Sequence, residues 1–184
     1  ALLRALFMLA GSPTHAAPSP IQGVYDLRLG MSPEQARQAM AADERFQRIA
    51  GRSFEGFPLF QTQLGEHWLR VRPSFSDDKL VKIALRFRET ASPNNVDPLI
   101  RDQLRFAAGA LSTRFGEPDR VPIPAQDLDG GDFQRGASLV SHAWQRGERH
   151  ARIMLWREGF EHGVDIVLAE HREHEAGGGA AGAF

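Results

Sequence analysis

The chain contains no cysteine among its 184 residues. This absence excludes disulfide bonds, thiolate metal sites, cysteine nucleophiles and a lipid-modified N-terminal cysteine. The charges of 22 lysine and arginine residues and 23 aspartate and glutamate residues nearly cancel, which leaves a formal net charge of −1. The chain as a whole therefore lacks the excess of positive charge that draws proteins to nucleic acid or to anionic membranes.

Long hydrophobic runs are also missing. A helix that crosses a bilayer needs about 20 consecutive apolar residues, and no stretch of this sequence reaches that length, so we expect no transmembrane segment in the mature chain. Hydrophobic residues nevertheless make up 42% of the chain and charged residues 24%. That balance is typical of a globular domain with a buried core, and the length suits one ordinary domain or two small packed halves.

The common catalytic motifs are absent as well. The sequence has no GxSxG elbow, no glycine-rich phosphate loop, no HExxH and no dinucleotide fingerprint. Ser141 and His142 are neighbours, and adjacent side chains of a regular strand point to opposite faces, so we expect them not to form a nucleophile–base pair. The sequence thus predicts a protein that is not an enzyme and needs no cofactor, with a hydrolase built from dispersed residues as a less favoured alternative.

The first seventeen residues have the pattern of an export signal. Arg4 precedes an apolar run from Ala5 to Ala10, and the small residues that follow include Thr14-His15-Ala16 as a cleavage tripeptide. This order is typical of a bacterial secretory signal. We therefore expect residues 1–17 to be a signal and the mature protein to be periplasmic or secreted; the alternative is an amphipathic N-terminal arm.

The clearest helix in the sequence lies between Asp97 and Pro118. Asp97 is a suitable N-cap, Pro98 suits the first helical position, and Gly116 is suited to end the helix in a left-handed conformation. Apolar residues recur at three- and four-residue steps on one face: Ile100, Leu104, Ala107, Leu111 and Phe115. A second, shorter helix is predicted after Gly30, with Ser32 as N-cap, Pro33 as first helical residue and Gln35 completing a capping box, and it should end before Asp43.

Strand-like segments follow each helix. The segment 79–88 is the best, because Val81, Ile83, Leu85 and Phe87 alternate with polar or small residues, which predicts a sheet with one buried and one wet face. The Ser76–Asp78 turn before it suits a hairpin. Residues 24–29 are predicted to form a short edge strand or an extended lead-in. The other predicted strands are 45–50, 59–64, 67–72, 139–145, 151–157 and 164–169.

The order of elements predicts an α+β fold. We expect two tandem helix-plus-antiparallel-sheet units of about three strands each, in one compact domain. The first unit would span 18–95 and the second 96–170, followed at 171–184 by a charged and then Gly/Ala-rich tail. Whether the two sheets join into one is left open by the sequence.

The segment LRLGMSPEQARQAM carries a resemblance. Its Gly30, Met31, Ser32 and Gln35 resemble the helix-start motif of small periplasmic proteins with a helix-plus-three-strand fold, which include the small lipoprotein of the outer-membrane β-barrel assembly machinery. The tandem layout is similar to that of β-lactamase inhibitor proteins, which repeat such a unit twice. The missing cysteine departs from the lipoprotein pattern. The resemblance implies a binding or scaffolding module and carries over no catalytic residue.

Tryptophan and arginine form stripes along three predicted strands. The stripes are Trp68, Arg70 and Arg72; His142, Trp144 and Arg146; and Arg152, Met154 and Trp156. Tryptophan and arginine are enriched at binding hot spots, so we predict that Trp68, Arg70, Arg72, Trp144, Arg146, Arg152 and Trp156 bind a partner protein. The alternative is structural, with the tryptophans closing the edges of the core and arginine stems covering them.

Two clusters of metal-ligating residue types do not have the pattern of a metal site. Asp127, Asp129 and Asp132 lie in a glycine-containing loop, but their spacing fails the calcium-loop pattern, so a solvated loop is favoured. His171 and His174 would face each other on a helix, with His162 further back, but they lie in or beside a charged terminal segment. We predict no metal site.

The sequence therefore predicts a non-catalytic exported protein that binds another protein through a Trp/Arg-rich sheet face, as an assembly factor, an adaptor or an inhibitor. The alternative is a periplasmic protein that binds a small ligand or a metal. A nucleic-acid binder is the least favoured class, because both the net charge and the predicted export argue against it.

Overall fold

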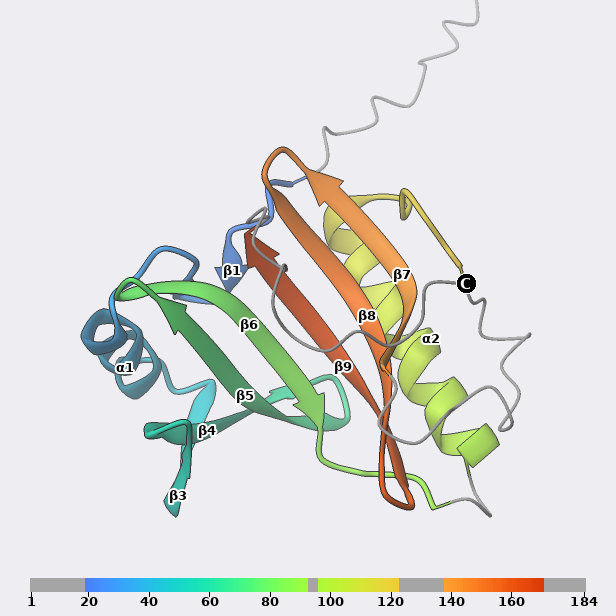
Figure 1. The fold of residues 1–184 in the computed structure, drawn as a ribbon, viewed down its shortest axis with the longest axis horizontal. Coiled ribbons are helices and arrows are strands. Elements are labelled where there is room, and N and C mark those ends of the chain that lie inside the picture. The colour runs from blue at the N-terminus through green and yellow to red at the C-terminus, as the bar shows by residue number, and fades with distance from the viewer. Residues whose placement is uncertain (1–18, 93–95, 123–137, 171–184) are drawn as a thin grey trace, which may run out of the picture.

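A computed structural model of the chain describes residues 19–92, 96–122 and 138–170. The predicted signal (1–17), the acidic loop with Asp127, Asp129 and Asp132, and the tail with His171 and His174 lie outside the described residues. In the described part, two helices and a seven-stranded antiparallel sheet form an α+β fold, which confirms the predicted fold class (Figure 1).

The sheet joins the two predicted halves. Its strands are β3 (Phe46–Phe54), β4 (Phe57–Leu64), β5 (His67–Ser76), β6 (Lys79–Phe87), β7 (Ser138–Arg146), β8 (Arg149–Glu158) and β9 (Glu161–Glu170), in the order β3-β4-β5-β6-β9-β8-β7. β6 pairs directly with β9, with Leu85 opposite Ile166. The prediction of two tandem units is therefore corrected: the sheet is continuous and a single hydrophobic core serves both halves.

Helix α1 (Pro33–Ala42) begins and ends as predicted. The Ser32 hydroxyl accepts a hydrogen bond of 3.2 Å from the Gln35 backbone N–H, and the Gln35 side-chain oxygen accepts one of 2.9 Å from the Ser32 N–H. This reciprocal pair is the capping box. Ala36 and Met40 are the buried residues of the helix, and they direct it against the end of the sheet formed by β3 and β4.

Helix α2 (Val96–Phe115) begins slightly earlier than predicted. Asp97 is therefore the second residue of the helix, where the prediction placed the N-cap. The predicted apolar face is confirmed, because Ile100, Leu104, Ala107, Leu111 and Phe115 are all buried. Gly116 has φ +78° and its N–H bonds to the Ser112 carbonyl, so it ends the helix as predicted.

The hairpin turns follow the local sequence. Asp77 and Asp78, between β5 and β6, both have positive φ angles, +51° and +56°, which matches a two-residue turn of the type that suits the right-handed twist of paired strands. Residues 24–29 differ from the prediction of a single short edge strand. They form a small hairpin of β1 (Gly23–Val24) and β2 (Leu27–Arg28), whose Val24 and Leu27 are buried in the main core.

The two faces of the sheet differ in what covers them. Both helices contribute to the core on one face, which we call the helix face; Figure 1 shows α2 lying along that side of β7, β8 and β9. The helix face is built from buried apolar residues that the strand register aligns: Leu69, Val71, Ile83, Leu85, Phe87, Ile153, Leu155, Val164, Ile166 and Leu168. The opposite side, which we call the open face, carries the alternate residues of the same strands. Neither described helix is long and apolar enough for a membrane crossing.

Candidate functional site

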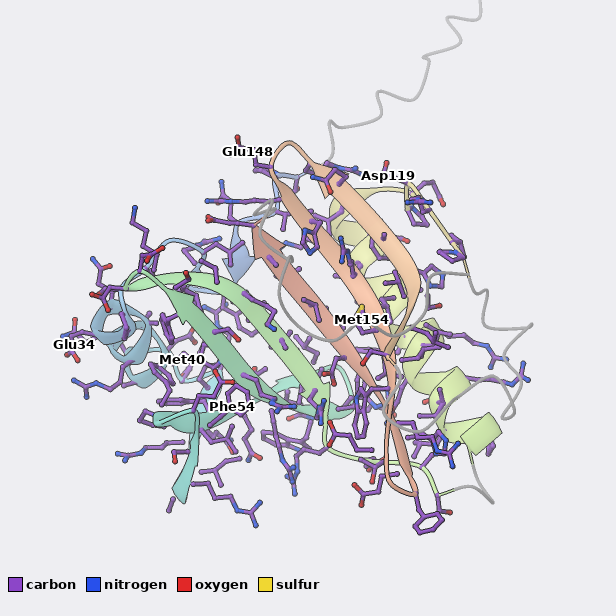
Figure 2. All side chains as sticks on the ribbon, viewed as in Figure 1. Glu34, Met40, Phe54, Asp119, Glu148 and Met154 are labelled. Carbon is purple, nitrogen blue, oxygen red and sulfur yellow. The ribbon has the colours of Figure 1, made fainter. Side chains whose placement is uncertain are left out.

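The strand register divides the predicted Trp/Arg stripes between the two faces. Arg70 lies opposite Arg86 and Arg72 opposite Ala84, which places Trp68, Arg70 and Arg72 on the open face. Arg152, Met154 and Trp156 lie on the same face, opposite Val167, Asp165 and Gly163. Figure 2 shows Met154 on the side of β8 that faces away from α2. These two stripes are therefore brought together on one surface.

The third stripe lies on the other face. Trp144 is opposite Ala151 on the helix face and is fully buried. Its indole N–H donates a 2.8 Å hydrogen bond to the Gly116 carbonyl, just beyond the end of α2. Arg146 donates to the Phe115 carbonyl at 2.6 Å and pairs with Asp119 at 2.9 Å. Both side chains thus bind the C-terminal end of α2 to β7, which is the structural alternative to partner binding, so they do not belong to the candidate binding surface.

A charged cluster lies at the centre of the open face. Arg86 Nε lies 3.0 Å from Asp165 Oδ1, and Arg86 Nη1 lies 3.0 Å from Glu158 Oε1. The Trp156 indole N–H donates a 2.8 Å hydrogen bond to the same Asp165 oxygen. The Arg86 guanidinium also lies over the Trp156 ring, 4.0 Å from its centroid. Trp156 is only 4% exposed, so its ring is a wall of this cluster and not a projecting anchor.

Burial changes the proton affinities in this cluster. Burial of Asp165 raises the pKa of its carboxyl, and this effect outweighs the hydrogen bonds from Arg86 and Trp156. For Arg86 burial acts against the charge, but the bonds to Asp165 and Glu158 more than compensate and raise the pKa of the guanidinium. Arg86 is therefore a well-neutralised cation.

Arg72 and Arg70 are compensated less well. Burial, together with the positive charge of Arg86, lowers the pKa of the Arg72 guanidinium. Arg72 stacks on Phe54, with 4.1 Å from its guanidinium carbon to the ring centroid, and makes no hydrogen bond or ion pair among the described residues. The Nε of Arg70 is buried and has no hydrogen-bond partner in that part of the chain. The open face thus holds two arginines with unused donors.

Two hollows mark the open face. The first, of about 250 Å³, lies beside Arg72, Arg86 and Trp156 and is also lined by Ser74, Lys82 and Met154. The second, of about 350 Å³, lies near the β7 edge, where Gln145, His150 and Arg152 approach Asp119 and Arg120. Arg152 thus lies on the same face as Arg72, at a second concave region.

The predicted separation of Ser141 and His142 is wrong. A β-bulge in β7 changes the register between Val140 and His142, and the Ser141 hydroxyl lies 2.9 Å from His142 Nδ1. A bulge breaks the alternation of faces on which the prediction relied. Ser141 is fully buried, and burial lowers the pKa of His142. The Ser141 hydroxyl is therefore hidden behind a half-buried imidazole, without the exposure that attack on a substrate requires.

The sequence does not single out Arg86 and Asp165, the central pair of the cluster, for two different reasons. Arg86 alternates with the apolar residues of its strand, which predicts that it lies on the polar face of the sheet. The alternation does not predict its pairing with Asp165. Asp165 is a single carboxylate inside the apolar run of β9, Val164–Ala169. An acidic residue in such a run is unusual unless it is paired, so the sequence does indicate that Asp165 has a partner.

Among the described residues, no three histidine, aspartate and glutamate side chains gather in a way that would hold a metal ion. Of the histidines set aside in the sequence, His162 is described, and it is buried at the start of β9. No protein-family model, curated protein or solved structure matches this chain. The resemblance carried by Gly30, Met31, Ser32 and Gln35 therefore stays a prediction.

Proposed function

We propose that this chain is a non-catalytic, exported protein that binds another protein through the open face of its sheet, as an assembly factor, an adaptor or an inhibitor. The observation that carries the proposal is the gathering of Trp68, Arg70, Arg72 and Arg152 on the face opposite the helices. Arginine and tryptophan are enriched in the energetically dominant parts of protein interfaces. Trp156 supports this surface from below by holding Arg86 and Asp165 in place.

The size of the hollow beside Arg72 favours a protein side chain over a whole small molecule at that point. Pockets that enclose a drug-sized ligand usually measure about 300–1,000 Å³ and bury most of that ligand. The hollow beside Arg72 measures about 250 Å³ and lies on a broad face, while the second hollow, of about 350 Å³, is at the low end of that range. A surface of this kind fits single side chains of a partner better than a whole small molecule.

Site-specific photo-crosslinking tests the proposal in the organism that produces the protein. A photoreactive benzoylphenylalanine replaces Gln63 or Gln145, which are exposed residues of β4 and β7 on the open face. The control replaces Gln38, an exposed residue of α1. We expect discrete crosslinked protein species from the two open-face positions and none of the same mass from Gln38. Identical species from all three positions, or none from the open face, would contradict the proposal.

The export part of the proposal has its own test. The support is the sequence of residues 1–17, with Arg4 before a short apolar run. Fractionation of the producing cells, followed by mass spectrometry of the protein, should find the chain in the periplasm or the medium with a new N-terminus near Ala17. An uncleaved chain found only in the cytosolic fraction would contradict export and leave the binding proposal standing.

A further inference from the structure

The arrangement of the arginines on the open face destabilises the fold. Arg70 and Arg86 are directly opposite each other on neighbouring strands, and like charges in that relation destabilise a sheet. Arg72 is close enough to Arg86 for the charge of Arg86 to lower its pKa. Asp165 and Glu158 compensate Arg86 through direct ion pairs. The charges of Asp165, Glu158 and Glu55 favour the charged form of Arg72 through space only. Within the described residues, no ion pair compensates Arg70 or Arg72.

The chemistry of the first hollow matches a carboxylate on an aliphatic stem. Arg72, Arg86 and Lys82 supply positive charge, and Ser74 supplies a hydroxyl. Two carboxylates, Asp165 and Glu55, also line the hollow, and Asp165 is paired with Arg86. Among the described residues of the lining, Arg72 and Lys82 are therefore the cations that remain for a ligand. Ala84, Met154 and Val167 give the hollow an apolar lining. An arginine guanidinium binds a carboxylate through two parallel hydrogen bonds, and the methylene groups of an acidic side chain would rest on the apolar lining.

We propose that this hollow binds the carboxylate of an aspartate or glutamate side chain in an acidic segment of the partner protein, with Arg72 and Lys82 as the contacting cations. The inference rests on the proposed function, since it names the chemistry that the open face recognises. Arg70 lies one position along the same face, and its charge would favour a second acidic residue next to the first. The partner segment is therefore acidic at more than one position.

Nuclear magnetic resonance of the full chain tests the inference with defined probes. Arginine Nε–H and tryptophan indole N–H signals are followed during titration with tetraglutamate and, separately, with tetraglutamine. We expect saturable shifts of the Arg72 Nε–H and Trp156 indole signals with tetraglutamate, and no saturable shift with tetraglutamine. Equal responses to both peptides would overturn the inference, because recognition would then not depend on the carboxylate.

Substitutions at Arg72 test whether tetraglutamate binds in this hollow. Arg72→Gln removes the charge and the two-pronged donor and should weaken tetraglutamate binding about tenfold or more. Arg72→Lys keeps the charge but loses the planar geometry and should weaken it by a smaller factor. Arg105→Gln, at an exposed position of α2, is the control and should leave the affinity unchanged. Unchanged affinity in a folded Arg72→Gln variant would overturn the inference.

A further arm distinguishes carboxylate from phosphate recognition. An oligothymidylate of four phosphates that shifts the same signals more strongly than tetraglutamate would overturn the inference in favour of a nucleic-acid ligand. Failure of this inference can also be distinguished from failure of the proposed function. If tetraglutamate fails while the Gln63 and Gln145 crosslinks persist, the open face binds a protein by other chemistry; if the crosslinks fail as well, the proposed function falls.

Discussion

The ring of Trp156 lies against Gly163 on the neighbouring strand so closely that a side chain would not fit between them. A Cβ atom built on Gly163 would lie 2.3 Å from Cζ2 of the indole. The missing side chain lets Trp156 lie flat on β9, where its N–H reaches Asp165 and its ring faces Arg86. The charged cluster of the open face therefore depends on a glycine that takes no direct part in it.

Gly163→Ala should displace the Trp156 indole. Overpacking a filled site costs about 1–3 kcal/mol, and the displaced indole would also lose its hydrogen bond to Asp165. Urea unfolding measures the loss, and the indole N–H resonance of Trp156 reports the displacement. The control is Gly109→Ala in α2, where a Cβ meets nothing within 4 Å; alanine should stabilise a helix interior by about 0.5–1 kcal/mol. Equal effects of the two substitutions would contradict this account.

Trp144 and Trp68 should respond differently to truncation. Trp144 is fully buried and bonded to the Gly116 carbonyl, so Trp144→Ala should cost about 3–5 kcal/mol of unfolding free energy. Trp68 is partly exposed on the open face, and Trp68→Ala should cost clearly less. Thermal and urea unfolding of the two variants provide the comparison. A Trp144 variant with nearly wild-type stability would show that the end of α2 is held by other contacts.

Removing one partner of the Arg86–Asp165 pair should lower the stability of the fold much more than removing both. The two side chains are 15% and 11% exposed, so Arg86→Met leaves a buried carboxylate and should cost about 3–5 kcal/mol. Combining it with Asp165→Leu removes both charges and should restore part of that loss. A double-mutant cycle from urea unfolding measures the coupling. Strict additivity would mean that the pair contributes no coupling in the folded protein.

The stability of the fold should decrease as the pH falls below about 6.5, the ordinary pKa of histidine. Burial, with a contribution from the nearby charge of Arg157, lowers the pKa of His162 in the folded state. Below pH 6.5 the unfolded chain therefore binds more protons than the folded one, and stability falls until the folded pKa is reached. One such group contributes a slope of up to about 1.4 kcal/mol per pH unit.

His162→Gln isolates that contribution. Urea unfolding at several pH values between 7 and 5 should give a shallower loss of stability for the variant than for the wild type. His142, whose pKa is also lowered by burial, keeps part of the slope in the variant. Identical slopes for the two proteins would show that His162 titrates normally in the fold.

Local chemistry determined the features that the sequence predicts well. The α1 start depends on hydrogen bonds between Ser32 and Gln35, which are three residues apart, and the α2 face on the spacing of Ile100, Leu104 and Leu111. The Asp77–Asp78 turn likewise depends on residues next to each other in the chain. Such features can be predicted from the sequence because all the atoms involved belong to one short segment.

Pairing between strands that are distant in the sequence decided which side chains meet, and on which face of the sheet. Alternation showed that each stripe has one face, but which face became buried depended on where the helices pack and on the bulge at Ser141, so Trp144 and Trp156 lie on opposite sides of the sheet. Arg86 and Asp165 are 79 positions apart, and only the β6–β9 pairing brings them together. The sequence by itself determined the helices, the strands and the amphipathic pattern, while the tertiary structure decided which charges meet, because register between strands is set by the packing of the whole core.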